Sequence, residues 1–203
     1  MSGAEHLRTT FNNLLSELAS WFGREGRSGG GLAAEALKRA DTDTYRRCRS
    51  EADPGALLDQ ASALPGALAP AQHVLACRAL LDWTCWSGGG LGDGVSARLF
   101  TTELVGPDGH IPADDVRVGL LVSAPHTDYP LSSHSGEETY LVISGEAEWI
   151  VGDEDYRPRP PGALVHHPAW MPHGRRTLNE PFLGAWRWSG DLNLGSFKVE
   201  DNG

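Results

Sequence analysis

Hydrophobic residues recur at helical spacing in the first third of the chain. Leucine and aromatic side chains stand three or four positions apart between Leu7 and Phe22, which predicts an amphipathic helix. The glycine-rich stretch GREGRSGGG follows at residues 23–31, and we expect a linker there because glycine disfavours helix. A later helix is expected to begin with Asp53 as its N-cap and Pro54 in its first turn. In all, further helices are predicted at residues 32–49, 54–63 and 69–82.

The pattern changes after a second glycine-rich stretch at residues 87–94. Short runs of Val, Leu, Ile and Trp now alternate with Gly, Pro and Asp turns, which is typical of strands. Strands are predicted at residues 97–105, 116–123, 126–131, 138–144, 147–152, 162–167, 173–178 and 182–189. This spacing favours an antiparallel sandwich or barrel, with a double-sheet jelly roll among the candidates. The GGGLGDG segment lacks the Lys-Ser/Thr of a phosphate-binding loop and is expected to be a linker.

Composition narrows the class of protein. A chain of 203 residues with 40% hydrophobic residues can bury a core, and its formal charge of −10 disfavours nucleic acid and anionic lipid surfaces as partners. It contains no apolar run of about 20 residues and no apolar core of a signal peptide, so we expect a cytoplasmic protein. The three cysteines have no zinc-type spacing and are expected to be reduced. We expect a helical extension over residues 1–90, a barrel over 91–190 and a peripheral tail over 191–203.

The stretch YPLSSHSGEETYLVISGEAEW, residues 129–149, gathers the most informative polar side chains. Glu138 and Tyr140 are two positions apart on a predicted strand, so their side chains point to the same face, which in a barrel can be the interior. His134 lies four positions before Glu138, in a turn from which its ring can reach the same space. These side chains either converge on a metal ion or form a polar loop leading into an ordinary strand.

A second histidine candidate comes from the later stretch PPGALVHHPAWMPHGRRT. A Pro-Gly turn and an apolar strand precede His173, which opens the next predicted strand. Imidazole nitrogens and carboxylate oxygens suit zinc, iron, nickel or manganese, and three or four such ligands with an open position make a Lewis-acid site.

HSGEETYLVISGEAEW followed by PPGALVHHPAWMPHGRRT resembles the two motifs of the cupin superfamily. In that pattern a Glu stands seven residues before the Gly of a hairpin turn, as Glu138 stands before Gly145, and a distant His, here His173, completes the metal site. Cupins usually carry His-x-His in the first motif, and Ser132 stands at the earlier of these positions. The resemblance covers about residues 96–190 and implies a mainly β protein, a cupin double-stranded β-helix or jelly-roll barrel, with an α-helical N-terminal extension.

A finer pattern is similar to the bacterial cupin-type dimethylsulfoniopropionate lyases. Tyr129-Pro130 leads to the His134 motif, and Trp186 and Trp188 stand on the last predicted strand. The resemblance implies a metal-dependent carbon–sulfur lyase that cleaves dimethylsulfoniopropionate, a small zwitterion, to dimethyl sulfide and acrylate by β-elimination.

This resemblance also implies roles for single residues. The metal ligands would be His134, Glu138 and His173, with Tyr140 as a fourth, around one divalent ion of zinc, iron, nickel or manganese. Tyr140 is the first choice as the catalytic base and Tyr129 the second. Tyr129, Trp186 and Trp188 would bind substrate, since a sulfonium cation is held well against aromatic faces.

Ordinary structural explanations compete with several of these roles. The two tryptophans and the two tyrosines are also what a packed barrel core needs, and a histidine in a turn is commonly exposed. His126 is equally suited to a structural hydrogen bond and to a substrate contact. His166 and His167 are adjacent and face opposite sides of a strand; neither matches the family ligand position, so both are left out of the site.

Two other function classes remain open from the sequence. One is a cupin that binds a small molecule without catalysis, as a sensor or storage protein, in which Ser132 marks a decayed metal site. The other is another metal-dependent cupin enzyme, a dioxygenase or isomerase, because fold does not fix function. The helical extension could be a lid, a pocket wall or a homodimer interface.

Overall fold

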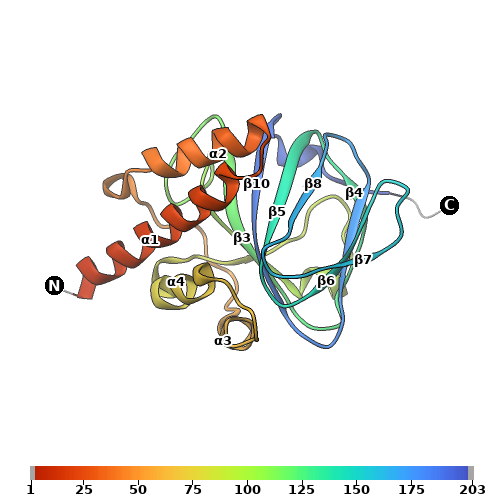
Figure 1. Cartoon of the computed structure of the whole chain (residues 1–203), viewed down its shortest axis with the longest axis horizontal. Coiled ribbons are helices and arrows are strands. Elements are labelled where there is room, and N and C mark those ends of the chain that lie inside the picture. The colour runs from red at the N-terminus through yellow and green to blue at the C-terminus, as the bar shows by residue number, and fades with distance from the viewer. Residues whose placement is uncertain (1–2, 201–203) are drawn as a thin grey trace.

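A layer of helices and two antiparallel sheets make up the structure, a computed structural model that describes residues 3–200 (Figure 1). The helices lie on one side, a six-stranded sheet stands in the middle, and a five-stranded sheet closes the other side. This arrangement confirms the predicted mainly β jelly roll with an α-helical N-terminal extension.

The six-stranded sheet carries most of the candidate residues. Its strands lie in the order β1-β2-β3-β10-β5-β8, and every neighbouring pair is antiparallel. The bounds of these strands are β1 Thr84–Cys85, β2 Leu99–Val105, β3 Arg117–Ser123, β10 Phe182–Gly190, β5 Gly136–Ser144 and β8 Leu164–His167.

The five-stranded sheet faces it across the barrel interior. Its order is β11-β4-β9-β6-β7, also antiparallel throughout. The bounds are β11 Lys198–Val199, β4 Asp128–Ser133, β9 His173–Thr177, β6 Ala147–Val151 and β7 Arg157–Arg159.

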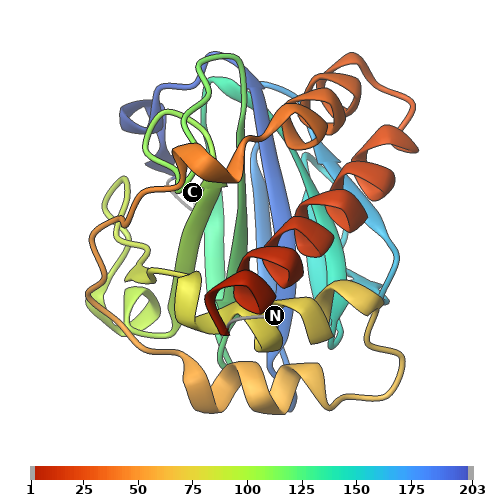
Figure 2. The same cartoon turned by 90° about the vertical axis from the view of Figure 1, so that its left-hand side faces the viewer.

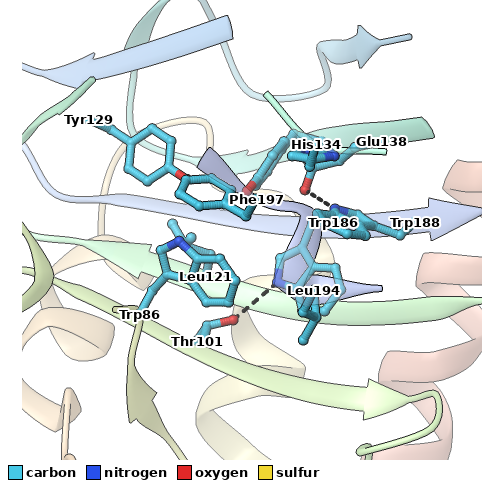
Figure 3. Close-up of a pocket in the computed structure, with 11 residues that line it drawn as sticks. Trp86, Thr101, Leu121, Tyr129, His134, Glu138, Trp186, Trp188, Leu194 and Phe197 are labelled. Atoms are coloured by element: carbon cyan, nitrogen blue, oxygen red, sulfur yellow. Dashed lines mark hydrogen bonds and ion pairs between the residues drawn. The ribbon is translucent and has the colours of Figure 1, made fainter. Parts of the chain in front are cut away.

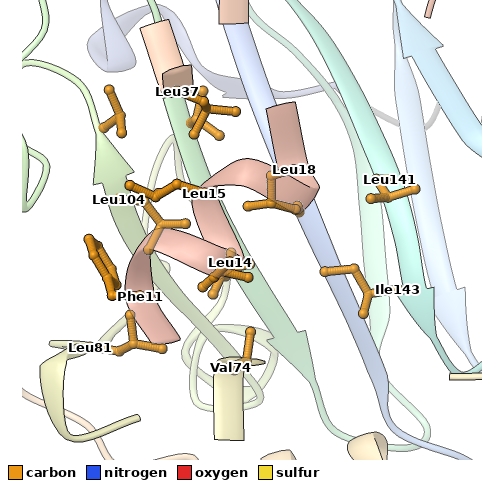
Figure 4. Close-up of a cluster of buried hydrophobic side chains, with 14 of the residues drawn as sticks. Phe11, Leu14, Leu15, Leu18, Leu37, Val74, Leu81, Leu104, Leu141 and Ile143 are labelled. Atoms are coloured by element: carbon orange, nitrogen blue, oxygen red, sulfur yellow. The ribbon is translucent and has the colours of Figure 1, made fainter. Parts of the chain in front are cut away.

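The helices pack against the outer face of the six-stranded sheet, as Figure 2 shows from the helical side. Side chains of α1 such as Leu14 and Leu18 meet Leu141 and Ile143 of β5 in one continuous apolar core (Figure 4). A second apolar cluster, which includes Val142, fills the space between the sheets. The helices are α1 Gly3–Gly23, α2 Ser28–Arg39, α3 Gly55–Ser62, α4 Ala69–Cys77 and α5 Asp93–Ser96, with 3-10 turns at Thr42–Thr44, Arg78–Leu80 and Leu194–Ser196.

The expectation of a linker through residues 23–31 is wrong, because α2 begins at Ser28 and includes three glycines. At Gly29 a Cβ would lie 2.3 Å from Ser189 Oγ and 2.5 Å from an Arg187 guanidinium nitrogen. The glycine therefore permits the helix start to approach the sheet closely, and this contact outweighs the low helix propensity of glycine.

The helix predicted over 32–49 is too long, since α2 ends at Arg39. The segment that follows bonds to a distant loop: the Arg46 backbone N–H donates to His110 O at 2.8 Å, and its guanidinium donates to Gly109 O and Pro107 O. These tertiary hydrogen bonds replace helical ones. The helices predicted at 54–63 and 69–82 are confirmed within a few residues, the latter ending in a 3-10 turn. The N-cap of α3 is Pro54 and not Asp53 as predicted, because the helix begins one residue later, at Gly55; Asp53 still accepts a hydrogen bond from the Gly55 N–H at 2.9 Å.

All eight predicted strands are present, and the short strands β1, β7 and β11 add to them. One connection differs from the expected hairpin: β5 and β6, joined at Gly145, belong to different sheets. Gly145 has φ +72°, and a Cβ there would lie 2.1 Å from Pro181 O, so the crossing requires glycine.

The C-terminal segment is not peripheral. β11 pairs with β4, and Phe197 beside it is buried at 5% exposure, in the cluster between the sheets. This segment therefore reaches the part of the barrel where the candidate site lies.

Candidate metal centre and active site

Three predicted ligands converge inside the barrel. His134 lies between β4 and β5, Glu138 on β5 and His173 at the start of β9, and one ligand atom from each lies within 4.8 Å of the others. All three side chains are buried. Segments almost forty residues apart in sequence thus bring two imidazoles and one carboxylate to a single point.

Hydrogen bonds to backbone carbonyls orient both imidazoles. Nδ1 of His134 lies 2.9 Å from Gly136 O, and Nδ1 of His173 lies 2.8 Å from Met171 O, so each Nδ1 carries a proton that it donates. The opposite nitrogens, Nε2, lie 3.3 Å and 3.6 Å from the same oxygen of Glu138, Oε2.

A neutral imidazole protonated at Nδ1 presents a lone pair at Nε2. Two such lone pairs facing a carboxylate oxygen repel it unless a cation, either a proton or a metal ion, lies between them. Burial lowers the pKa of His173 well below its ordinary value, so this imidazole is neutral at neutral pH. The donor set therefore fits a divalent metal ion such as zinc, iron, nickel or manganese.

Glu138 is held as an anion by its neighbours. Burial would raise its pKa, but when the intervening cation is a proton, hydrogen bonds with His134 and His167 outweigh burial and hold the pKa well below its ordinary value. The indole N–H of Trp188 donates to Glu138 Oε1 at 2.7 Å, as Figure 3 shows. One oxygen is therefore fixed by Trp188, and the other faces the imidazoles.

His167 joins the centre, although the sequence argument left it out. It is fully buried, its Nδ1 lies 3.3 Å from Glu138 Oε2, and its ring stacks on His173 with centroids 3.9 Å apart. Its Nε2 is buried and has no hydrogen-bond partner among residues 3–200. Burial lowers the pKa of His167.

Strand alternation alone allowed one of the two adjacent histidines to point inward, and it is His167; His166 faces the helices and lies 3.8 Å from Glu25. The pairing of Glu138 with His167 across β5 and β8 decides the choice, and local sequence does not encode that register.

The two tyrosines line the same pocket as His134 and Glu138. Burial raises the pKa of Tyr129, while hydrogen bonds from Ser132 and Trp86 to its hydroxyl oppose the rise. Burial also raises the pKa of Tyr140 well above its ordinary value, and the nearby Arg175 opposes it. Both phenols are thus neutral at neutral pH unless further positive charge enters the pocket.

Aromatic side chains form the rest of the pocket wall (Figure 3). Trp186 donates its indole N–H to Leu120 O at 3.2 Å, and Trp188 stacks on the His134 ring with centroids 4.0 Å apart. Trp86 and Phe197, which the motif-based argument did not include, meet edge to face at 5.4 Å. They come from segments flanking the barrel, so only the folded chain brings them to the pocket.

Two other residues singled out in the sequence are now placed. Ser132 is buried, pairs with His173 across β4 and β9, and its hydroxyl lies 3.5 Å from His173 O. His126 is exposed, has φ +53° and is not among the residues that line this pocket. None of the pocket-lining residues comes from α1 to α4, so in the described chain these helices are not a pocket wall.

Comparison with known proteins decides the family. A family model for dimethylsulfoniopropionate lyase matches residues 55–184, more than half of the chain. The chain belongs to the dimethylsulfoniopropionate lyase family. Family membership makes it a carbon–sulfur lyase and sets aside the alternative of a non-catalytic cupin. In the described residues, no helix is both long and apolar enough to cross a membrane.

Two lyases are similar along the sequence. The chain is 28% identical to the dimethylsulfoniopropionate lyase DddQ of Ruegeria pomeroyi over 187 residues, which cover 90% of each protein. It is 33% identical over 90 residues to the putative dimethylsulfoniopropionate lyase DddL of Cereibacter sphaeroides, which covers 43% of this chain and 37% of that protein.

Solved structures of such lyases share the fold. The crystal structure of DddQ from Ruegeria pomeroyi matches with a TM-score of 0.70 at 27% identity, covering 91% of this chain and 93% of that one. A structure described with the lyases RdDddP and RnDddQII matches with a TM-score of 0.72 at 24% identity, covering 96% and 100%.

Proposed function

We propose that this lyase cleaves dimethylsulfoniopropionate to dimethyl sulfide and acrylate by β-elimination, in the pocket beside His134, Glu138 and His173. The observation that carries the proposal is the convergence of two carbonyl-oriented imidazoles on one buried carboxylate, at the edge of an aromatic pocket, in a chain of this family.

His134, Glu138 and His173 would hold a divalent transition metal ion, with Tyr140 as a fourth ligand. Such an ion would act as a Lewis acid, spreading the negative charge that develops when a proton leaves the carbon next to the substrate carboxylate. Trp188 and the carbonyls of Gly136 and Met171 would keep the ligands in place, because they fix Glu138 and both imidazole tautomers.

Tyr140 is our first choice for the base. Its phenolate would take the α-proton, the C–H electron pair would form the new double bond, and the C–S bond would break with its electrons going to sulfur. The neutral phenol favoured by burial must first lose its proton, and positive charge beside the hydroxyl supports that loss. Tyr129, held by Ser132 and Trp86, is the second choice and would otherwise orient the substrate.

The aromatic wall would hold the other end of the zwitterion. A sulfonium cation is weakly hydrated, and each aromatic face contributes about 0.5 to 2 kcal/mol to binding a cation. The faces of Trp186, Trp86 and Phe197 border the pocket and are suited to this contact.

The test is incubation of the purified protein with dimethylsulfoniopropionate, followed by gas chromatography for dimethyl sulfide and proton NMR for acrylate. We expect equal amounts of both products, loss of activity after dialysis against a chelator and return on adding a divalent transition metal. Absence of both products from metal-loaded protein would exclude this substrate, and full activity after verified metal removal would exclude the metal.

A further inference from the structure

Three arginines are buried in the described chain, and they differ in their partners. Arg117 pairs with Glu103 at 2.7 Å and with Asp108 at 2.8 Å. Arg187 pairs with two glutamates on the helix-facing side of the sheet. Arg175, which is 3% exposed, forms no ion pair with any carboxylate of residues 3–200.

Aromatic rings surround the guanidinium of Arg175. One of its nitrogens donates to Ser123 Oγ at 3.1 Å, and the hydroxyl of Tyr140 is a further hydrogen-bond partner. Its central carbon lies 5.0 to 5.5 Å from the centroids of four rings, those of Tyr129, Tyr140, Trp149 and Phe182. Cation–π contacts offset part of the cost of burying the charge but do not neutralise it.

Glu138, a carboxylate on the same interior face, does not neutralise Arg175 either. Glu138 is engaged by His134, His167 and Trp188. An unneutralised positive charge therefore lies directly behind Tyr129 and Tyr140, which line the pocket, and it acts on both phenols. Among the described residues, no buried arginine that lacks an ion pair contacts Trp86, Trp186 or Phe197 on the other side of the pocket.

We propose that Arg175 is a positioning residue that draws the carboxylate of the substrate to the Tyr129–Tyr140 side of the pocket. Arg175 does not line the pocket, so it acts through these two tyrosines and through its field in a low-dielectric interior. The same charge repels a sulfonium and leaves it to the tryptophan side, which sets the direction in which the zwitterion enters. This role rests on the proposed function.

The test compares Arg175→Gln with the unaltered protein in binding two half-substrates. Acrylate carries the carboxylate alone, and trimethylsulfonium carries the cation alone; both are titrated by calorimetry into protein of measured metal content. The Gln side chain still offers Ser123 a hydrogen bond but removes the charge. We expect acrylate to bind about tenfold more weakly, equivalent to about 1.4 kcal/mol, and trimethylsulfonium to bind equally or more tightly.

Three controls separate attraction from structural support. Arg176→Gln removes the same charge from the neighbouring outward-facing position, where Arg176 pairs with Glu148, and should leave both affinities unchanged. Arg175→Lys restores the charge and should restore the preference for acrylate, which keeps the test decisive if the Gln variant fails to fold. Melting temperature and metal content are measured for every variant.

Several outcomes would overturn the inference: equal weakening of both ligands, an unchanged acrylate affinity in Arg175→Gln, or lost acrylate preference in folded Arg175→Lys. Failure of the proposed function is a separate result, because it would appear as absence of dimethyl sulfide from the unaltered protein. The half-substrate titrations do not require turnover.

Discussion

The two faces of the six-stranded sheet differ in their side chains: one face packs against the helices, and the other lines the pocket. On β5, Leu141 and Ile143 face the helices, whereas Glu138 and Tyr140 face the barrel interior. On β10 the same alternation puts apolar side chains toward the helices and tryptophans toward the pocket. Neighbouring residues of one strand therefore have different roles. A substitution on the helix-facing side should change stability, and one on the interior side should change the chemistry.

Both faces also contain buried charged side chains, but the two faces differ in whether these charges form ion pairs. Behind the pocket, Arg187 is neutralised by Glu25 and Glu137, which ties the end of the α1 region to β10 and β5. Inside the barrel, Glu138 and Arg175 are not paired with each other. Charge on the helix-facing side is thus neutralised within the protein, whereas Glu138 and Arg175 on the interior side would be available to the proposed metal ion and substrate.

The largest effect is expected from Tyr140→Phe on the interior face. Removing the hydroxyl should lower kcat by roughly 10² to 10⁴, the usual contribution of general acid–base catalysis, while the melting temperature changes little. Steady-state kinetics of dimethyl sulfide release measure it. Tyr156→Phe, on a half-buried tyrosine packed by Arg176 outside the pocket, is the matched control and should keep full activity. Retention of full activity by Tyr140→Phe would remove this residue as the base.

The opposite outcome is expected for Leu14→Ala on the helix-facing side. Leu14 is fully buried in the core between α1 and the sheet, and its truncation should cost about 2 to 5 kcal/mol of unfolding free energy. The value of kcat below the melting transition should stay close to that of the unaltered protein. Urea denaturation and kinetics on the same samples measure both quantities; Leu32→Ala, at a 46% exposed position, should be nearly silent. A large fall in kcat would mean that the two faces are coupled.

A smaller effect is expected from His167→Ala. Because His167 touches Glu138 and stacks on His173, its loss should weaken metal binding by about 10- to 100-fold, as for other residues that orient ligands. Competition with a fluorescent chelator measures the affinity. His166→Ala changes the adjacent residue on the helix-facing side and should leave metal affinity unchanged. Equal losses of metal affinity in His167→Ala and His166→Ala would contradict the assignment of His167 to the interior face and His166 to the helix-facing side.

The smallest effect concerns pH and His110, a buried histidine on the helical side. Its Nδ1 lies 3.0 Å from Arg46 O, its Nε2 accepts from the Asp82 N–H, and burial lowers its pKa. The unfolded chain therefore binds a proton that the folded chain does not, so stability is full above pH 6.5 and falls as the pH drops toward the folded-state pKa.

The slope that His110 contributes is at most about 1.4 kcal/mol per pH unit. Urea denaturation of metal-free protein at several pH values should show a shallower slope for His110→Gln than for the unaltered protein. His6→Gln, at an exposed position of α1, should keep the original slope. Identical slopes in all three proteins would show that His110 is not responsible.

Much of the fold was predictable because its signals are local. Side-chain alternation identified all eight longer strands, and helical spacing identified α1, α3 and α4. Residues 23–31 misled the prediction because Gly29 of α2 serves a close contact with Arg187 and Ser189 of β10, which lie more than 150 residues away. The short strands β1, β7 and β11 were not predicted either, because two or three residues are too few to show a hydrophobic periodicity.

By itself, the sequence determined that Glu138 and Tyr140 share one strand face and that His134 and His173 are candidate partners, because strand alternation fixes side-chain direction locally. Only the tertiary structure decided that His167 faces Glu138 and that Trp86 and Phe197 border the pocket. It also decided that Arg175 lies beside Tyr129 and Tyr140 with no ion-pair partner among residues 3–200. These placements follow from strand register and from contacts between segments distant in sequence, and both depend on how the whole chain packs.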